Sequence, residues 1–257
     1  MTKATLSEMS RSIIITSGKG GVGKTTTAVN LATAMNSMNE DVTLIDLNLT
    51  TPNVGLHLGA PVVPITLNHV LSGRAELVDA IYEHESGTKI IPSSLSVREL
   101  KKLNTKNLHS ISKDVKNISD IVIFDGAAGL GQEATSAMFL ADDVVIVTNP
   151  EMPSVTDALK TAKVAEEMGK NVLGAIVTRV RGKKSEMTLQ SISEMLELPI
   201  LGVVPEDDNV QEALSMRNAL TITHPRSKAS KAYRQIAAKI LGKEFEEKGF
   251  WARVLGM

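Results

Sequence analysis

One stretch near the start of the chain limits the possible folds more than any other. Residues Ser12–Ser17 form an isoleucine-rich run that predicts a buried β-strand, and the glycine-rich segment Gly18–Thr25 follows at once. A helical pattern, Thr25–Met38, begins where the glycines end. The segment fits G-x-x-x-x-G-K-[ST], and a chance match in a chain of this length has a probability of about 1%. A strand, a glycine-rich turn and a helix in this order favour an α/β fold.

The rest of the chain repeats the alternation of strand and helix. Further strands are predicted at Val42–Leu47, Lys89–Pro92, Ile121–Asp125, Val144–Thr148, Val172–Thr178 and Ile200–Val204. Further helices are predicted at Val97–Leu103, Glu133–Leu140, Thr156–Met168, Ser185–Leu196 and Lys228–Leu241. Continuous apolar runs indicate strands buried on both faces. The sequence therefore predicts an α/β fold with a doubly wound, mostly parallel sheet flanked by helices.

The alternation runs without a repeat or a low-complexity linker, so a single domain is predicted over residues 12–242. A polar lead-in, residues 1–11, precedes it. Gly242 is placed to end the last helix, and a tail, residues 243–257, follows.

Composition excludes several classes of function. The chain has 257 residues, no cysteine and a net charge of -1. Without cysteine there is no disulfide framework, thiolate zinc site, iron–sulfur cluster or cysteine nucleophile. A charge near zero gives no overall attraction to nucleic acid. No apolar run approaches the roughly 18–20 residues that span a bilayer, and the polar N-terminus does not fit a secretory signal.

The glycine-rich segment has the composition of a phosphate-binding loop. Its glycines permit conformations that turn successive N–H groups toward an anion, and the following helix adds its dipole. Lys24 is expected to neutralise the β- and γ-phosphates of a nucleotide, and the Thr25 hydroxyl to ligate Mg²⁺. The predicted phosphate-binding residues are Gly18, Gly20, Gly21, Val22, Gly23, Lys24, Thr25 and Thr26.

Two aspartates end predicted strands. The carboxyl ends of parallel strands form the ligand-binding edge of a doubly wound sheet. Asp46 is expected to reach Mg²⁺ or its waters from this edge. Asp125 closes an apolar run in the Walker B pattern and is expected to hold Mg²⁺ through water.

The run from Lys19 to Thr25 resembles the deviant Walker A motif of the MinD/ParA ATPase superfamily. In that family the early lysine reaches across a nucleotide-sandwiched dimer to the partner's phosphates. The resemblance therefore implies an ATP-dependent homodimer and a catalytic Lys19 that acts in trans. A solvated surface lysine is the alternative. The resemblance to the MinD branch extends from about Ile13 to the C-terminus.

The segments after Asp46 and Asp125 resemble the two switch regions of the MinD branch, with departures. Asn48 stands where family members usually carry an aspartate that orients the attacking water, and an amide cannot accept a proton. Hydrolysis is therefore expected to be slow or to rest on positioning of the water alone, and the alternative is that Asn48 only caps its turn. Ala127 replaces the usual proline of the second switch, and Gly129 is expected to place its N–H on the γ-phosphate.

The resemblance also suggests where the base binds. The family often uses an asparagine–arginine pair after a late strand, and here the pair is Thr178-Arg179. Pro205, Glu206 and Asp207 match the family's loop whose backbone lies against the adenine. ATP and ADP with Mg²⁺ are the implied cofactors, although Thr178 weakens the argument for base selectivity.

The tail combines aromatic and aliphatic side chains. On a helix that advances about 100° per residue, Phe250, Trp251, Val254 and Leu255 fall within an arc of about 140°. Such a stripe with basic residues at its margins is typical of a helix that lies in a membrane interface. The tail resembles the C-terminal membrane-targeting sequence of the MinD branch. A tail packed on its own domain is the alternative.

These features predict a Mg²⁺-dependent ATPase that dimerises on ATP and lies on the cytoplasmic face of the cell membrane. By analogy with the family that it resembles, it would position a cell-division or polar structure, together with an unidentified regulatory protein, and DNA binding is not expected. One alternative is a ParA-type DNA-partitioning ATPase, which the tail does not favour. Another is a small-molecule kinase or ligase on the same fold, for which Lys19 would be optional.

Overall fold

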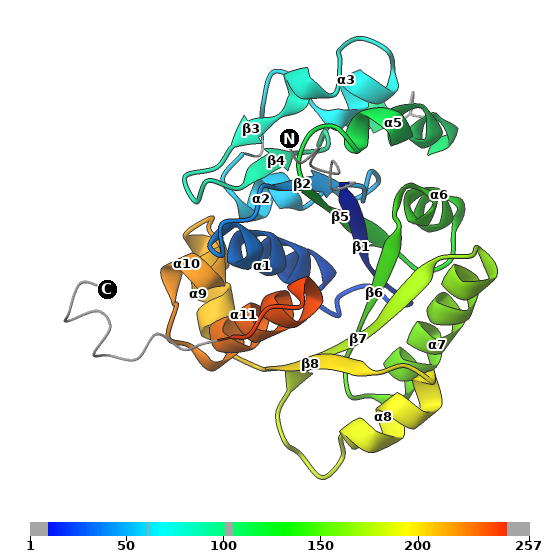
Figure 1. Ribbon diagram of the computed structural model, residues 1–257, viewed down its shortest axis with the longest axis vertical. Coiled ribbons are helices and arrows are strands. Elements are labelled where there is room, and N and C mark those ends of the chain that lie inside the picture. Colours follow the sequence, from blue (N-terminus) through cyan, green and yellow to red (C-terminus); the bar gives the residue numbers. More distant parts are fainter. Residues whose placement is uncertain (1–9, 61, 101–104, 246–257) are drawn as a thin grey trace, which may run out of the picture.

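An eight-stranded sheet forms the centre of the computed structural model, which describes residues 10–60, 62–100 and 105–245 (Figure 1). The strand order is β3-β4-β2-β5-β1-β6-β7-β8. The strands are β1 (Arg11–Ser17), β2 (Val42–Asp46), β3 (Tyr82–Glu83), β4 (Lys89–Ile91), β5 (Ile121–Ala128), β6 (Asp143–Thr148), β7 (Asn171–Val180) and β8 (Ile200–Pro205). Only β3 runs antiparallel to its neighbour among the described strands. The predicted doubly wound, mostly parallel sheet is confirmed.

Helices cover both faces of the sheet (Figure 1). One face carries α1 (Lys24–Asn36), α9 (Asn209–Ser215), α10 (Leu220–Thr223) and α11 (Lys228–Leu241). The other carries α6 (Gln132–Leu140), α7 (Met152–Glu167) and α8 (Leu189–Leu196). Shorter elements connect β2 to β5: α2 (Val54–His57), α3 (Leu67–Leu71), the 3₁₀ turn η1 (Val78–Ala80), α4 (Val97–Leu100), the 3₁₀ turn η2 (Thr105–Ile111) and α5 (Ser112–Val115).

Strand β1 shows why the apolar runs are continuous. Ile14 packs in the core cluster that contains residues of α6, α7 and α8. Ile13 and Ile15 pack in the other cluster, with α1 and α11. All three side chains are at most 1% exposed. Because both faces are buried, every position of the strand favours an apolar residue.

The topology places one end of β1 at the functional edge. After β1 the chain forms β2, β3 and β4 on one side of the sheet. Later in the sequence, β5 lies between β2 and β1, and β6 lies on the opposite side of β1. Such a reversal of strand order opens a crevice at the carboxyl ends of the strands. Asp46 of β2 and Asp125 of β5 lie in register at this edge, beside the turn from β1 into α1.

Helix α8 begins later than the predicted Ser185. It starts at Leu189 because the Thr188 hydroxyl accepts the backbone N–H of Ser191 and caps the helix. Glu186 instead turns back and accepts the N–H groups of the loop after β7. The predicted C-terminal glycine is confirmed at α11, where Gly242 adopts the left-handed conformation with φ 67°.

Other differences involve short or irregular elements. The strand β3 was not predicted, since two residues give no periodic pattern. Helix α7 begins at Met152, four residues before the predicted start, with Pro153 in its first turn, where proline is favoured.

Within the described ranges, no helix is long and apolar enough to cross a bilayer. The predicted membrane residues 250, 251, 254 and 255 lie outside the described residues.

Candidate nucleotide-binding site

The phosphate loop, residues 18–25, connects β1 to α1. Gly21 and Gly23 have φ angles of +80° and +94°, which residues with a side chain rarely adopt. Thr178, at the end of β7, lies beneath the loop and donates its hydroxyl to the carbonyl of Val22 at 2.6 Å. The backbone N–H of Thr27 bonds to the Gly23 carbonyl at 2.9 Å and starts the helix. The loop is therefore held from both β7 and α1.

Lys24 and Thr25 begin α1 and face Asp125. Lys24 is only 8% exposed, and burial lowers the pKa of its ammonium group, while Asp125 opposes this shift. The Thr25 hydroxyl donates to Oδ2 of Asp125 at 2.6 Å. Burial raises the pKa of Asp125 to about 6, and the bond from Thr25 and the charge of Lys24 oppose that rise.

The second carboxylate oxygen of Asp125 indicates a site for a cation. Oδ1 is buried and has no hydrogen-bond partner among the described residues. A buried carboxylate oxygen without a donor is costly, so a site of this kind calls for a ligand. Carboxylate and hydroxyl oxygens are the ligands that Mg²⁺ takes, usually together with waters and substrate phosphates. Thr25 and Asp125 therefore fit a hydrated divalent cation beside the phosphate loop.

Asp46 lies next to Asp125, but its carboxylate already accepts hydrogen bonds from three backbone N–H groups. It is fully buried and accepts the backbone N–H groups of Asn48 (3.1 Å), Asn53 (2.9 Å) and Val54 (3.0 Å). Burial, and secondly the charge of Asp125, raise the pKa of Asp46, while the three N–H bonds lower it. Asp46 thus ties both ends of the loop 48–54 to the edge of the sheet, and its contact with Mg²⁺ or its waters stays a prediction.

Asn48, at the position predicted to orient the attacking water, and Gly129, predicted to contact the γ-phosphate, both make hydrogen bonds within the protein. Asn48 donates its side-chain N–H to the carbonyl of Thr51 at 2.7 Å and accepts the Thr51 hydroxyl at 3.0 Å. Asn48 therefore closes a turn, as the alternative interpretation of this residue held. Gly129 donates its N–H to the carbonyl of Ser17 at 2.8 Å. The single N–H of Gly129 must leave Ser17 before it can reach a phosphate, whereas the Asn48 amide keeps a second N–H beyond the one given to Thr51.

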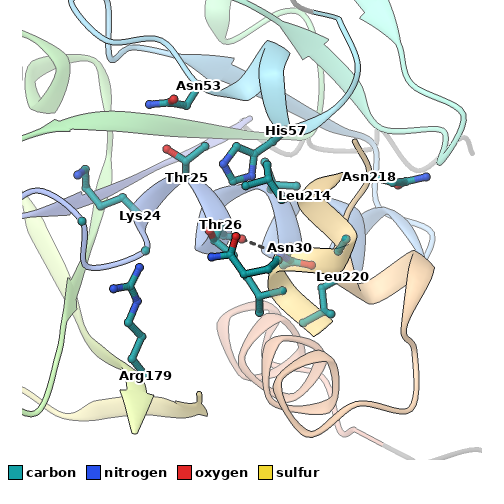
Figure 2. A pocket seen from close by; sticks show the side chains of 16 residues that line it. Lys24, Thr25, Thr26, Asn30, Asn53, His57, Arg179, Leu214, Asn218 and Leu220 are labelled. Atoms are coloured by element: carbon teal, nitrogen blue, oxygen red, sulfur yellow. Dashed lines mark hydrogen bonds between the residues drawn. The ribbon is translucent and has the colours of Figure 1, made fainter. Parts of the chain in front are cut away.

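A groove extends from the phosphate loop along α1 (Figure 2). It has two cavities, of about 300 Å³ and about 200 Å³, and Gly23, Thr26 and Arg179 line both. The larger reaches α2 and α9, and Figure 2 shows His57 and Leu214 at that end. The smaller reaches the loop after β8. Arg179 extends from β7 toward the phosphate loop (Figure 2) and lines both cavities.

The predicted base-binding residues line the smaller cavity. Thr178, Arg179, Pro205, Glu206 and Asp207 all border it. The side chain of Glu206 forms an ion pair with the neighbouring loop after β7, and its hydrogen bonds there lower its pKa. Asp207 accepts backbone N–H groups at the starts of α9 and α11. Both carboxylates are therefore engaged with the protein, and a contact of the loop backbone with a base stays a prediction.

Several groove residues were not identified from the sequence. Asn30, His57, Gln211 and Tyr233 line the cavities, and burial lowers the pKa of His57. Burial also raises the pKa of the Tyr233 hydroxyl to about 12. No local pattern marks these residues, because they come from four helices that meet only in the folded chain.

Lys19 lies outside this groove. Its side chain is exposed, and its carbonyl accepts the Ser17 hydroxyl at 2.7 Å, which fixes the backbone of the loop beneath it. Lys19 and Lys24 therefore differ: Lys24 is buried beside Asp125 of its own chain, and Lys19 is exposed, while its action on a partner's phosphates stays a prediction.

Comparison with known proteins agrees with this geometry. Residues 13–220 match the family model described as the CobQ/CobB/MinD/ParA nucleotide binding domain. An uncharacterized ATP-binding protein of Methanocaldococcus jannaschii is 38% identical over 93% of this chain and 90% of its own length. The cell division ATPase MinD of Pyrococcus furiosus superposes with a TM-score of 0.88, at 32% identity, over 91% of this chain and 99% of that one.

A further solved structure bears on the ligand. The septum site-determining protein MinD of Pyrococcus horikoshii, complexed with Mg-ADP, superposes with a TM-score of 0.87 at 34% identity, over 90% of this chain and 96% of that one. The sequence match, the strand order and the phosphate loop agree with one another. The chain belongs to the CobQ/CobB/MinD/ParA nucleotide binding domain family, and its fold is that of the MinD/ParA ATPases.

Proposed function

We propose that this chain is a Mg²⁺-dependent ATPase that dimerises on ATP, binds the membrane through its C-terminal tail and positions a partner. The observation that carries the ATPase proposal is the Thr25–Asp125 pair, whose free buried oxygen lies beside Lys24 and the phosphate loop. The Mg-ADP found in the Pyrococcus horikoshii relative fits the same kind of site.

The residues of the site divide the work of phosphoryl transfer. Lys24 and the backbone N–H groups of the loop would bind the phosphates and stabilise the charge that develops in the transition state. Thr25 and Asp125 would hold Mg²⁺, which supplies further positive charge to the phosphate oxygens. Asn48 would orient the attacking water without taking its proton. Lys19 would complete the site of the opposite subunit.

The proposed cell-biological role depends on the tail and on the relatives. Residues 243–257 would bind the inner face of the cell membrane with Phe250, Trp251, Val254 and Leu255 in the interface. Two relatives are named for cell division or septum-site determination. We therefore propose that the ATP-bound dimer gathers on the membrane, where it recruits a regulatory protein and positions a division or polar structure. Hydrolysis would release it.

Co-sedimentation tests this proposal directly. Purified chain is mixed with anionic liposomes or with double-stranded DNA, each with ATP or ADP and Mg²⁺, and the pelleted fraction is measured. We expect ATP-dependent sedimentation with liposomes and none with DNA. Phosphate release is measured in parallel, with Lys24→Ala as the control that lacks the phosphate-binding lysine.

The possible results separate the alternatives. Retention on DNA that depends on ATP and falls with salt would favour a partitioning ATPase instead. Sedimentation with liposomes that is equal in ATP and ADP would contradict the switch. An absence of phosphate release above the Lys24→Ala level would contradict the ATPase itself.

A further inference from the structure

Glu133 connects the two segments that flank the phosphate site. It is the second residue of α6 and lies four residues after Gly129. Its Oε1 accepts the backbone N–H of Thr50 at 2.9 Å, and its Oε2 accepts the Thr50 hydroxyl at 2.6 Å. One carboxylate thus takes both polar hydrogens of a residue at the tip of the loop that follows β2.

The loop is fixed at its other points by groups from its own segment. Asp46 binds the N–H groups at positions 48, 53 and 54, which ties down the two ends. The paired bonds between Asn48 and Thr51 close the turn in the middle. The contact with Glu133 differs from these, since it joins the tip of the loop to a helix far along the chain. It therefore determines where the closed turn sits relative to α6.

The chemistry of this contact suits a positioning role. A carboxylate that accepts from both an N–H and an O–H makes two charge-assisted bonds, which are stronger and more directional than neutral ones. The first turn of a helix also favours a negative charge, so α6 stabilises the carboxylate that reaches out to Thr50. Glu133 is half-buried and Thr50 is exposed, so the contact lies at the surface of the molecule.

We propose that Glu133 is a positioning residue for phosphoryl transfer: through Thr50 it sets the place of the Asn48 turn, and so couples the first switch to α6 and the second switch. This inference rests on the proposed ATPase function. Both carboxylate oxygens of Glu133 accept from Thr50, and we assign its effect to this contact with the backbone N–H and hydroxyl of Thr50. Its loss should therefore affect turnover and leave nucleotide affinity unchanged.

The test compares Glu133→Gln with wild type in steady-state and single-turnover ATP hydrolysis. The amide keeps one acceptor oxygen and sets an N–H₂ group against the second donor of Thr50. We expect kcat to fall by about tenfold, as misplacement of a reacting group does. KM for ATP and the affinity for ADP should stay within about twofold. Gln132→Ala, an exposed change in the same helical turn, serves as the matched control and should leave both constants unchanged.

Changes at Thr50 test the link itself. Thr50→Val removes the hydroxyl and should lower kcat, whereas Thr50→Ser keeps the hydroxyl and should stay close to wild type. Because both partners act through one contact, Thr50→Val should have little further effect in the Glu133→Gln background. Additive effects would overturn the proposal. So would an unchanged kcat in Glu133→Gln, or a rise in KM with kcat unchanged.

Failure of the proposed function is recognised separately. If wild type binds ATP but does not hydrolyse it, the ATPase proposal fails. The positioning role is then decided by hydrogen exchange of residues 48–54 with ATP bound. Glu133→Gln must weaken the protection of this loop, and equal protection in both proteins would overturn the role of Glu133.

Discussion

Asp125 is a charge that the fold holds at a cost. It is fully buried, its pKa is raised to about 6, and Oδ1 has no donor among the described residues. At pH 7.5 the folded chain must keep this group ionised, whereas the unfolded chain ionises it freely. A cation that binds with the nucleotide would offset the unfavourable free energy of keeping Asp125 ionised.

Asp125→Asn should therefore stabilise the protein without nucleotide by about 1–3 kcal/mol at pH 7.5, and should abolish Mg²⁺-dependent nucleotide binding. The folded-state pKa lies above the unfolded one, so wild type takes up a proton in the folded state as the pH falls through about 6. The gain from the substitution should shrink over that range. Denaturant titrations at pH 7.5 and 5 measure the difference in free energy of unfolding between the variant and wild type. A variant less stable than wild type at pH 7.5 would contradict an unfavourable burial of the Asp125 charge.

Lys19 should matter to the assembly and not to the single chain. It is exposed on the outside of the phosphate loop, whereas Lys24 is buried beside Asp125. Lys19→Ala should leave the affinity of the monomer for ADP unchanged and prevent the ATP-dependent dimer. Size-exclusion chromatography with ATP and ADP measures the dimer. A Lys19→Ala protein that dimerises normally on ATP would refute the trans role.

At this scale the sequence identified the phosphate loop and Asp125 because their spacing is a local pattern. It did not reveal that Thr178 supports Val22, or that Glu133 reaches Thr50, since these contacts join residues far apart in the chain. It left two interpretations of Asn48 open. The structure shows the turn-closing bonds to Thr51, and a role in water positioning is still a prediction.

Among the elements, helix α7 limits what the phosphate loop can tolerate. A Cβ added to Gly18 would lie 2.2 Å from the backbone of Asp157 in α7, a distance that side chains essentially never show. A Cβ on Gly20 would meet nothing within 4 Å. The loop therefore packs on α7 at Gly18 and faces open space at Gly20.

Gly18→Ala should lower the free energy of unfolding by about 1–3 kcal/mol, because either the loop or α7 must move. Gly20→Ala, the matched control in the same loop, should change it by less than about 1 kcal/mol. Thermal and denaturant unfolding without nucleotide compare the two, which keeps ligand contacts out of the measurement. Equal destabilisation by both substitutions would show that the contact with Asp157 is not the cause.

Apart from β3, the strands were predictable to within a few residues because burial on both faces produces continuous apolar runs, as in β1 and β5. β5 continues to Ala128, beyond the predicted end at Asp125, because its last residues still pair with β1. The short helices α9 and α10 were missed, since seven and four residues give too little periodicity. Tertiary packing determines such elements, and a local sequence pattern does not specify them.

For the whole molecule, the dimer and the tail have to be considered together. Burying four large side chains in a membrane offers roughly 6–12 kcal/mol, and ordering about ten residues costs about as much. A single tail is therefore expected to bind weakly. Two tails on one dimer would bind far more firmly, since the second tail would be held close to the surface at high effective concentration. ATP-dependent dimerisation would then suffice to switch membrane binding.

Membrane binding should be lost in two independent ways. Deleting residues 249–257 should abolish ATP-dependent sedimentation with liposomes and leave the dimer intact on a sizing column. Lys19→Ala should abolish sedimentation with the tail still present, because only one tail is offered at a time. Fusing the Lys19→Ala chain to a constitutive dimerisation domain should then restore liposome binding and remove its dependence on ATP. If the fused protein stays in the supernatant, avidity is not the basis of the switch, and the ATP state must act on the tail in another way.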